Sequence, residues 1–399
     1  MKFSIIIPAY NEEKAIGDTI ERTLSAKDRI VKLTKYNEVE IIIVNDGSKD
    51  NTPEIVRRYL GVILIDNSIN KGYGTALKEG FLHASGDLLG FIDADGTCDP
   101  LFFLELIKVL HVQDADIALG SRLGVDSQMP KIRMIGNKLF AFIINFFGNS
   151  KIIDSASGMR VFKRGVLEKL YPLPDGLHFT PAMSCKAVMN KEVKIIEIPM
   201  PYKERVGASK LRICKDGIRF LRVIFEAILF YKPLKFLSSI GIFLICIAIM
   251  YSFKPIFYYL YYGRIEEDFI YRLISIVVFC LVGFNFIILG FLGSEMAAVM
   301  NSQKIFLGKV RSRWLKSLFC PRSFLIIGAI MSMFGVLINI GPISEYVHAG
   351  KILTHWVYIL VGGFLVLLGA QIITYGFFYK IILLFSEKFS LIGRDRKSS

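Results

Sequence analysis

Short apolar runs rich in β-branched residues alternate with amphipathic stretches over the first half of the chain. The spacing predicts strands at residues 3–8, 39–46, 61–66, 87–95 and 116–121. It predicts helices between them, at residues 12–26, 53–60, 74–84 and 100–110. Apolar strands that alternate with helices are typical of a mostly parallel sheet covered on both faces. We therefore expect residues 1–210 to form a Rossmann-like α/β domain.

Four long apolar segments follow, at residues 234–253, 270–294, 324–340 and 355–378. Each is close to the length of about 20 apolar residues that a helix needs to cross a bilayer core. The pattern predicts an all-α transmembrane region of four helices in residues 234–385 and a basic tail in residues 386–399. No internal repeat is evident in the sequence of these segments.

Charge is distributed unevenly between the two halves of the chain. The formal net charge is +14, yet residues 1–210 hold 28 basic and 26 acidic residues, whereas residues 211–399 hold 21 and 9. The excess lies before the first span, between the second and third spans, and in the tail, which the positive-inside rule assigns to the cytoplasm. We expect an integral, multi-pass protein of a prokaryotic cell membrane with both termini cytoplasmic, and no nucleic-acid partner.

The segment 211–233 joins the two regions and interleaves basic with apolar residues. Its apolar positions are Ile218, Leu221, Phe225 and Ile228, with Arg219 and Arg222 between them. This pattern predicts an amphipathic juxtamembrane helix on the membrane surface. The alternative is a core helix of the α/β domain. The segment Lys131–Phe147 has a similar form and is expected to lie on the membrane too.

Polar residues follow several of the predicted strands. They form the stretches "PAYNEE" (8–13), "NDGS" (45–48), "DAD" (93–95) and "GSR" (120–122). Ligands of doubly wound sheets bind beyond the carboxyl ends of the strands, so these stretches are expected to meet at one edge. A row of Asp, Asn and Gly residues there fits a nucleotide better than a packing role.

Asp93 and Asp95 lie one residue apart after a strand, in "FIDADGTCDP". Two like charges in one site repel, and such pairs usually share a cation or accept hydrogen bonds. A D-x-D alone is a weak signal because turns favour Asp. Asp99 precedes Pro100 and is expected to cap a helix rather than bind a ligand.

The ordered set "IIIPAYNEE", "IIIVNDGSKDNT", "NKGYGTALKEG" and "FIDADGTCDP" resembles family 2 glycosyltransferases. The later stretches "DSASGMRVF" (154–162) and "IPMPYKERVGASKL" (198–211) resemble the polyprenyl-phosphate sugar synthases, such as dolichol-phosphate mannose synthases. The resemblance covers roughly residues 1–235. It implies a GT-A fold for the cytoplasmic domain.

The resemblance further implies a nucleotide-sugar donor of the UDP-glucose or GDP-mannose class, bound with Mg²⁺ or Mn²⁺. Asp95 matches the metal ligand, and Asp93 lies beside it at the donor phosphates; we expect both to act in catalysis. The residues that match the nucleotide site are Pro8, Tyr10, Glu12, Asp46 and Lys71, together with Asp93. Simple packing at a strand end is the alternative for Tyr10. Thr97 stands where some relatives have Gln, which leaves the third metal ligand open.

The implied acceptor is a polyprenyl or dolichyl phosphate, whose oxygens Arg can hold in bidentate geometry. The matching residues are Arg122, Ser157, Arg160, Arg205 and Lys210, of which Lys210 is alternatively an ordinary interfacial basic residue. Asp154 matches an acid that acts as general base or orients the acceptor. The expected reaction is an inverting, metal-dependent displacement that gives a lipid-phosphate-linked sugar for glycan or glycoprotein assembly.

Two alternatives remain at this point. A processive polysaccharide synthase usually carries Q-x-x-R-W, but "VRSRW" (310–314) has Val in place of Gln and lies between spans. A lipid-sugar transporter or scaffold with a degenerate transferase domain would need polar groups inside the spans. Such groups are sparse, which favours anchoring, with homo-oligomerisation left open. An oxidoreductase is excluded because no G-x-G-x-x-G follows the first strand.

Overall fold

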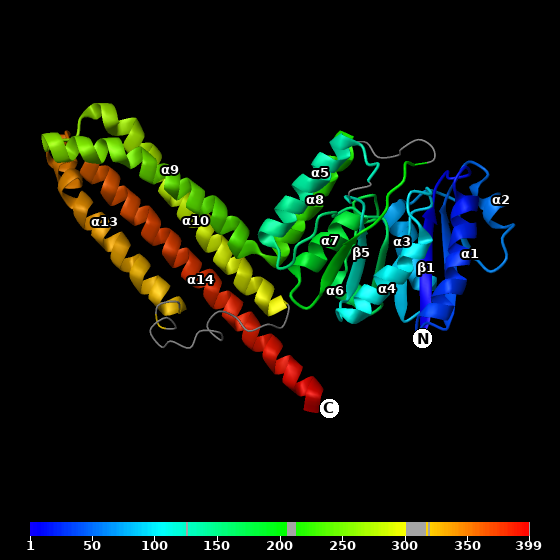
Figure 1. The fold of residues 1–399 in the computed structure, drawn as a ribbon. Helices are drawn as coiled ribbons and strands as arrows, with labels where there is room; N and C mark the ends of the chain where they lie inside the picture. Colours follow the sequence, from blue (N-terminus) through cyan, green and yellow to red (C-terminus); the bar gives the residue numbers. More distant parts are fainter. Residues whose placement is uncertain (125–126, 206–212, 301–316, 318–319, 399) are drawn as a thin grey trace. The chain divides into compact units, whose positions relative to one another are not determined.

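The computed structural model describes residues 1–124, 127–205, 213–300, 317 and 320–398. The chain divides into two compact units, Met1–Tyr231 and Lys232–Ser399. The first is an α/β unit and the second is all-helical (Figure 1). The expected fold class, a mostly parallel α/β domain followed by four long apolar helices, is confirmed.

In the described part of the first unit, one sheet has seven strands. They are β1 Lys2–Ala9, β2 Glu38–Asp46, β3 Ile63–Asn67, β4 Leu88–Phe91, β5 Ile117–Ser121, β6 Arg160–Lys163 and β7 Ile195–Pro199. Their order is β3-β2-β1-β4-β6-β5-β7. All neighbours are parallel except β6, which is antiparallel to both β4 and β5.

The five predicted strands are all present, but β6 and β7 were not predicted. The four residues of β6 are too few to show a period, and the half-buried β7 lies at the edge of the sheet. The fourth strand ends at Phe91 rather than at residue 95. The DAD segment is therefore a loop that leaves the sheet at its carboxyl edge.

Helices cover both faces of the sheet. They are α1 Ile16–Leu33, α2 Thr52–Val56, α3 Tyr73–His83, η1 Pro100–Phe102, α4 Phe103–Val112, α5 Lys131–Phe147, α6 Val166–Leu170, α7 Phe179–Met189 and α8 Ile213–Tyr231. Asp99 caps η1 as expected, because its side chain accepts a hydrogen bond from the backbone N–H of Leu101 at 3.0 Å.

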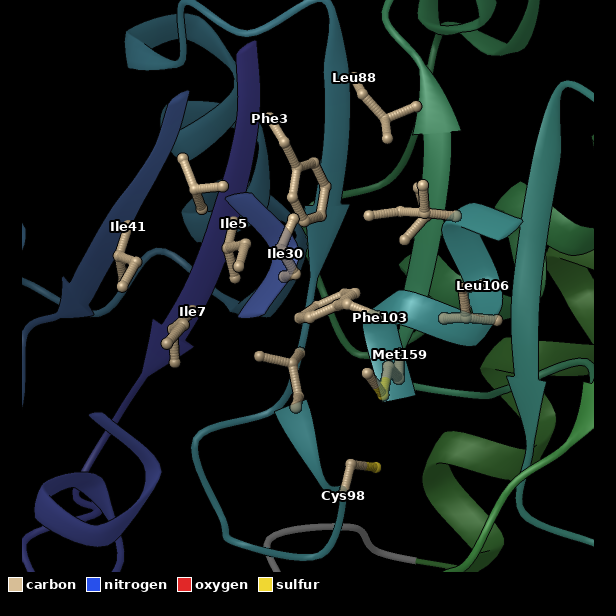
Figure 2. Close-up of a cluster of buried hydrophobic side chains, with 14 of the residues drawn as sticks. Phe3, Ile5, Ile7, Ile30, Ile41, Leu88, Cys98, Phe103, Leu106 and Met159 are labelled. Atoms are coloured by element: carbon tan, nitrogen blue, oxygen red, sulfur yellow. The ribbon is translucent and has the colours of Figure 1, made fainter. Parts of the chain in front are cut away.

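The core depends on the two-residue period of β1. Phe3, Ile5 and Ile7 point to the face covered by α1 and α4, and the ring of Phe3 meets Phe103 edge-on at 5.5 Å (Figure 2). Ile6 points to the opposite face, against Gly80 of α3. Each side chain buried this fully contributes about 1.5–3 kcal/mol. This two-sided burial fixes the register of β1 and thereby the strand ends that carry the polar loops.

The second unit consists of two helical hairpins. Its helices are α9 Pro233–Tyr262, η2 Glu267–Phe269, α10 Ile270–Met300, α13 Pro321–Ala349 and α14 Trp356–Ser398. Four segments have a mean hydropathy of 2.2 to 2.7 and the length to cross a membrane. Helix α9 packs on α10, α13 packs on α14, and the hairpins meet through α10 and α14. This composition and length are those of a multi-pass membrane protein.

Gly80 allows α3 to lie directly on β1. A Cβ there would be 2.4 Å from Cγ2 of Ile6. We expect Gly80→Ala to destabilise this contact by about 1–3 kcal/mol, because a close-packed core resists an added carbon. Hydrogen-exchange mass spectrometry of the full chain should show faster exchange in α3. The matched control is Gly165→Ala, where nothing lies within 4 Å of the added Cβ; equal effects of both changes would contradict the expectation.

Candidate active site

A pocket of about 510 Å³ lies at the carboxyl edge of the sheet in the first unit. It brings together eight of the residues singled out from the sequence, which are Pro8, Tyr10, Glu12, Asp46, Asp93, Asp95, Arg122 and Arg205. Lys71, Asp154, Ser157 and Arg160 are not among its lining residues. Lys210, Arg313 and Trp314 lie outside the described residues.

The carboxylate of Asp93 lies against the backbone at Gly158. The hydroxyl of Tyr73 donates to its Oδ1 at 2.7 Å, and a Cβ at Gly158 would come within 1.9 Å of its Oδ2. Burial, followed by repulsion from Asp95, raises the pKa of Asp93 from its ordinary 3.8 to about 7. Gly158 is therefore required, since any side chain would occupy the place of the carboxylate.

Asp95 is held on both sides. The backbone N–H and hydroxyl of Thr97 donate to its Oδ1 at 3.2 and 2.7 Å. Nη1 of Arg205 lies 3.2 Å from its Oδ2, and Nη2 of the same guanidinium pairs with Glu12. The Thr97 hydroxyl thus orients Asp95.

The groups around Asp93 and Asp95 bear on whether the pocket could hold a divalent cation. Among the described residues, no group of three or more His, Cys, Asp and Glu side chains has metal-site geometry. The two carboxylates nevertheless fit one hard cation, because both line the pocket, and burial followed by the repulsion from Asp95 raises the pKa of Asp93. The Arg205 guanidinium already supplies positive charge to Asp95.

Asp154 forms a buried pair with Arg122. Its Oδ2 accepts from Nε of Arg122 at 2.7 Å, and its Oδ1 accepts from Nη2 at 2.8 Å. The side-chain amide of Asn137 and the backbone N–H groups of Arg122 and Ala156 also donate to it. Burial alone would raise the pKa of Asp154, but the Arg122 charge and these donors hold it below its ordinary value. Asp154 therefore positions Arg122, which lies 5.6 Å from the ring centre of Tyr202.

Arg160 and Ser157 lie beneath the pocket rather than in it. Arg160 is fully buried and donates to the backbone carbonyls of Ser155, Ser157 and Thr180. Burial lowers its pKa to about 10. The Ser157 hydroxyl donates to the carbonyl of Gly120. These bonds fix the backbone of residues 155–158 against Asp93, so both residues act on the site through the loop.

Asp46 binds backbone in this structure. It accepts hydrogen bonds from the N–H groups of Lys71 and Gly72 at 2.8 and 2.9 Å, while burial raises its pKa. The Lys71 side chain turns away to Glu79, with Nζ 3.0 Å from the carboxylate. Gly72 has φ +105°, which a side chain would strain.

Several pocket residues were not assigned to the site from the sequence. They are Tyr73 of α3, Arg133 and Asn137 of α5, Tyr202, and Gly217, Arg219 and Phe220 of α8. Basic residues in the two amphipathic segments were the available signal. The sequence could not show that Arg133 and Arg219 line the pocket, because this depends on how α5 and α8 pack against each other.

Both helices have an exposed apolar face. On α5, Ile132, Ile135, Leu139, Phe142 and Phe146 are between 52% and 68% exposed. On α8, Ile218 and Phe225 are exposed, but Ile228 is fully buried together with Ile224. The expectation that Ile228 faces the membrane is wrong, because that side of α8 packs on α7 and α5.

The raised pKa of Asp93 makes a pH-dependent prediction. The folded protein binds this proton more tightly than the unfolded chain, so the stabilisation is present below about pH 4 and is lost as pH rises through about 7. Without divalent cations, the Tm of the wild type should fall relative to that of Asp93→Asn between pH 5 and pH 8. A Tm difference that does not change with pH would contradict this.

The Arg122–Asp154 pair predicts a second result. Asp154→Asn leaves a buried guanidinium without its counter-charge, which costs about 3–5 kcal/mol. Arg122→Gln in the same chain removes that charge and should restore most of the amide protection around β5 in hydrogen exchange. If the double variant is as unprotected as the single one, the pair does not stabilise the loop through charge.

Comparisons with known proteins identify the family of the chain. The model of the family described as glycosyl transferase family 2 matches residues 4–171. A low-salt glycan biosynthesis hexosyltransferase, Agl6 of Haloferax volcanii, is 34% identical over 61% of this chain; the match spans 59% of that relative. An undecaprenyl-phosphate 4-deoxy-4-formamido-L-arabinose transferase of Edwardsiella ictaluri is 25% identical over 75% of this chain and 89% of its own.

Among solved structures, glucosyl-3-phosphoglycerate synthase of Mycobacterium tuberculosis superposes with a TM-score of 0.42 and 21% identity, over 57% of this chain and 77% of its own. A dolichyl-phosphate hexose transferase of Haloferax volcanii is 31% identical over 52% of this chain and 86% of that relative. Together with the match of the family model, this similarity shows that the chain belongs to glycosyl transferase family 2.

Proposed function

We propose that the protein transfers a monosaccharide from a UDP- or GDP-linked sugar to a polyprenyl or dolichyl phosphate at the cytoplasmic membrane face. One observation carries the proposal: a single pocket holds Asp93 and Asp95 from the sheet edge and Arg133 and Arg219 from two amphipathic helices. The carboxylates suit a cation that accompanies a diphosphate, and the guanidinium groups suit an anionic acceptor.

The donor would lie over the strand ends. Pro8, Tyr10 and Glu12 line that side of the pocket, and Asp46 holds the Lys71–Gly72 backbone at its rim. Mg²⁺ or Mn²⁺, held by Asp95 and Asp93, would neutralise the diphosphate and the charge that develops on the leaving oxygen. Because the pKa of Asp93 is about 7, it would release a proton when a cation binds.

The reaction would be one inverting displacement. A phosphate oxygen of the acceptor attacks the anomeric carbon, a new carbon–oxygen bond forms, and the bond to the diphosphate breaks. A phosphate monoester has a second pKa of about 6 and is largely ionised already, so little base catalysis is needed. This agrees with Asp154 being committed to Arg122.

The acceptor would enter between α5 and α8. Their exposed apolar side chains suit a membrane surface, while Arg133 and Arg219 line the pocket. Arg219 is half-exposed and also pairs with Asp216 on its own helix, with Nη1 3.2 Å from Oδ1. Such amphipathic helices bind bilayers through the apolar face. The four apolar helices would anchor the enzyme, with the α/β unit, the basic segment between the second and third spans and the tail on the cytoplasmic side.

The test is transfer from radiolabelled UDP-glucose and GDP-mannose, in separate reactions, to a polyprenyl phosphate with Mn²⁺ or Mg²⁺. We expect label in the lipid phase with one donor, loss of transfer with chelator, and at least about a hundredfold lower turnover in Asp95→Asn, since removing one transition-state contact typically costs about that. Full activity of Asp95→Asn, or no lipid product from any nucleotide sugar of a wider panel, would refute the proposal.

Arg133 and Arg219 should act on the acceptor alone. Each charge-assisted hydrogen bond contributes about 1.5–3 kcal/mol, so Arg133→Ala or Arg219→Ala should raise the acceptor KM about tenfold or more and leave the donor KM unchanged. The control is Arg222→Ala on the same helix, because Arg222 is not among the residues that line the pocket and its side chain is 79% exposed. An equal rise in the control would show a non-specific effect of surface charge.

A further inference from the structure

The two hairpins of the helical unit repeat the same glycine contact. A Cβ on Gly241 of α9 would lie 2.4 Å from the carbonyl oxygen of Gly283 on α10. A Cβ on Gly328 of α13 would lie 2.6 Å from the carbonyl oxygen of Gly369 on α14. In each case the next atoms met belong to an isoleucine four residues further along the partner helix.

Other positions recur with the same offset of 86 to 88 residues. The pairs are Pro233 and Pro321 at the helix starts, Pro255 and Pro342 inside the helices, Gly263 and Gly350 at the left-handed caps, and Gly290 and Gly376 at the second contact. Helices α13 and α14 are thus a second copy of α9 and α10. The repeat is not evident in the sequence, because few of the positions between these landmarks are identical.

The two copies meet through different faces of their second helices. On α10 the contacting residues are Ile288, Phe291 and Leu292, and on α14 they are Tyr375, Tyr379 and Ile382. The rings of Phe291 and Tyr379 are 5.3 Å apart. By the repeat, the α10 face corresponds to Thr374, Phe377 and Phe378, and the α14 face corresponds to Leu289, Gly293 and Met296.

This interface is heterologous, because the two hairpins contribute different faces to it. On each hairpin, the face that corresponds to the partner's contact face is therefore left exposed. Phe377 and Phe378 are 56% and 55% exposed on the second hairpin. Leu289 and Met296 are 46% and 57% exposed on the first. Heterologous contacts can be repeated by further copies, and they form a ring when the rotation closes.

We propose that a second copy of this chain docks on these open faces. Phe378 of one chain would meet Leu289 of the next, in the way that Leu292 clusters with Tyr375 within the chain. By the repeat, Phe378 stands where the first hairpin has the smaller Leu292, so the second hairpin presents a larger apolar side chain on its open face. The proposal does not depend on the reaction assigned to the α/β unit.

Cysteine cross-linking in native membranes tests this arrangement. In a full chain with Cys214, Cys246, Cys280 and Cys320 replaced by Ala, the pair Leu289→Cys and Phe378→Cys should oxidise to products at multiples of 45.1 kDa. The pair Leu292→Cys and Tyr375→Cys should close within one chain and leave the mass unchanged. The control pair Ile249→Cys and Phe334→Cys, on exposed parts of α9 and α13, should not link.

Native mass spectrometry from lipid nanodiscs gives an independent result. The wild type should be an oligomer, Phe378→Ala should release 45.1 kDa monomers, and Phe334→Ala should not. A monomeric wild type, equal linking of the control pair, or failure of the Leu292–Tyr375 pair to close would each overturn the proposal. Normal sugar transfer by a monomeric Phe378→Ala would leave the proposed reaction intact, so the two hypotheses are tested separately.

Discussion

The repulsion between Asp93 and Asp95 at the end of β4 is the constraint on which the pocket depends. Both carboxylates are buried, and they differ in the groups that contact them. Asp95 receives the Thr97 donors and the Arg205 guanidinium, whereas Asp93 receives one phenol and keeps a pKa near 7. The site is therefore set to gain from a further positive charge at Asp93.

The segment 154–158, which precedes β6, supports this arrangement. Arg160 ties its carbonyl groups together, the Arg122–Asp154 pair closes its other side, and Gly158 brings its backbone against Asp93. These buried charges are costly to place and are retained with nearly complete hydrogen bonding. They fix the pocket floor, while the exposed faces of α5 and α8 leave the opposite wall suited to a lipid surface.

In the helical unit, packing replaces the hydrophobic effect as the organising force, since lipid tails are as apolar as the side chains. Glycines at the contacts between α9 and α10 and between α13 and α14 let the backbones approach closely. The same glycine contact occurs in both hairpins. The hairpins contact each other through different faces of α10 and α14, so a further copy could bind to the faces that remain exposed.

The sequence by itself determined the strand-and-helix alternation, the four apolar helices, and seven of the residues that meet in the pocket, because strand ends and hydrophobic length are local properties. Arg205, the eighth, was assigned only through the family resemblance. It did not determine β6 or β7, whose short segments are strands only through their neighbours. Only the tertiary structure showed that Arg160 and Asp154 support the pocket from outside its lining, and that Arg133 and Arg219 line it. The direction of a side chain depends on which elements pack against its own helix or strand, and a local sequence pattern does not show those contacts.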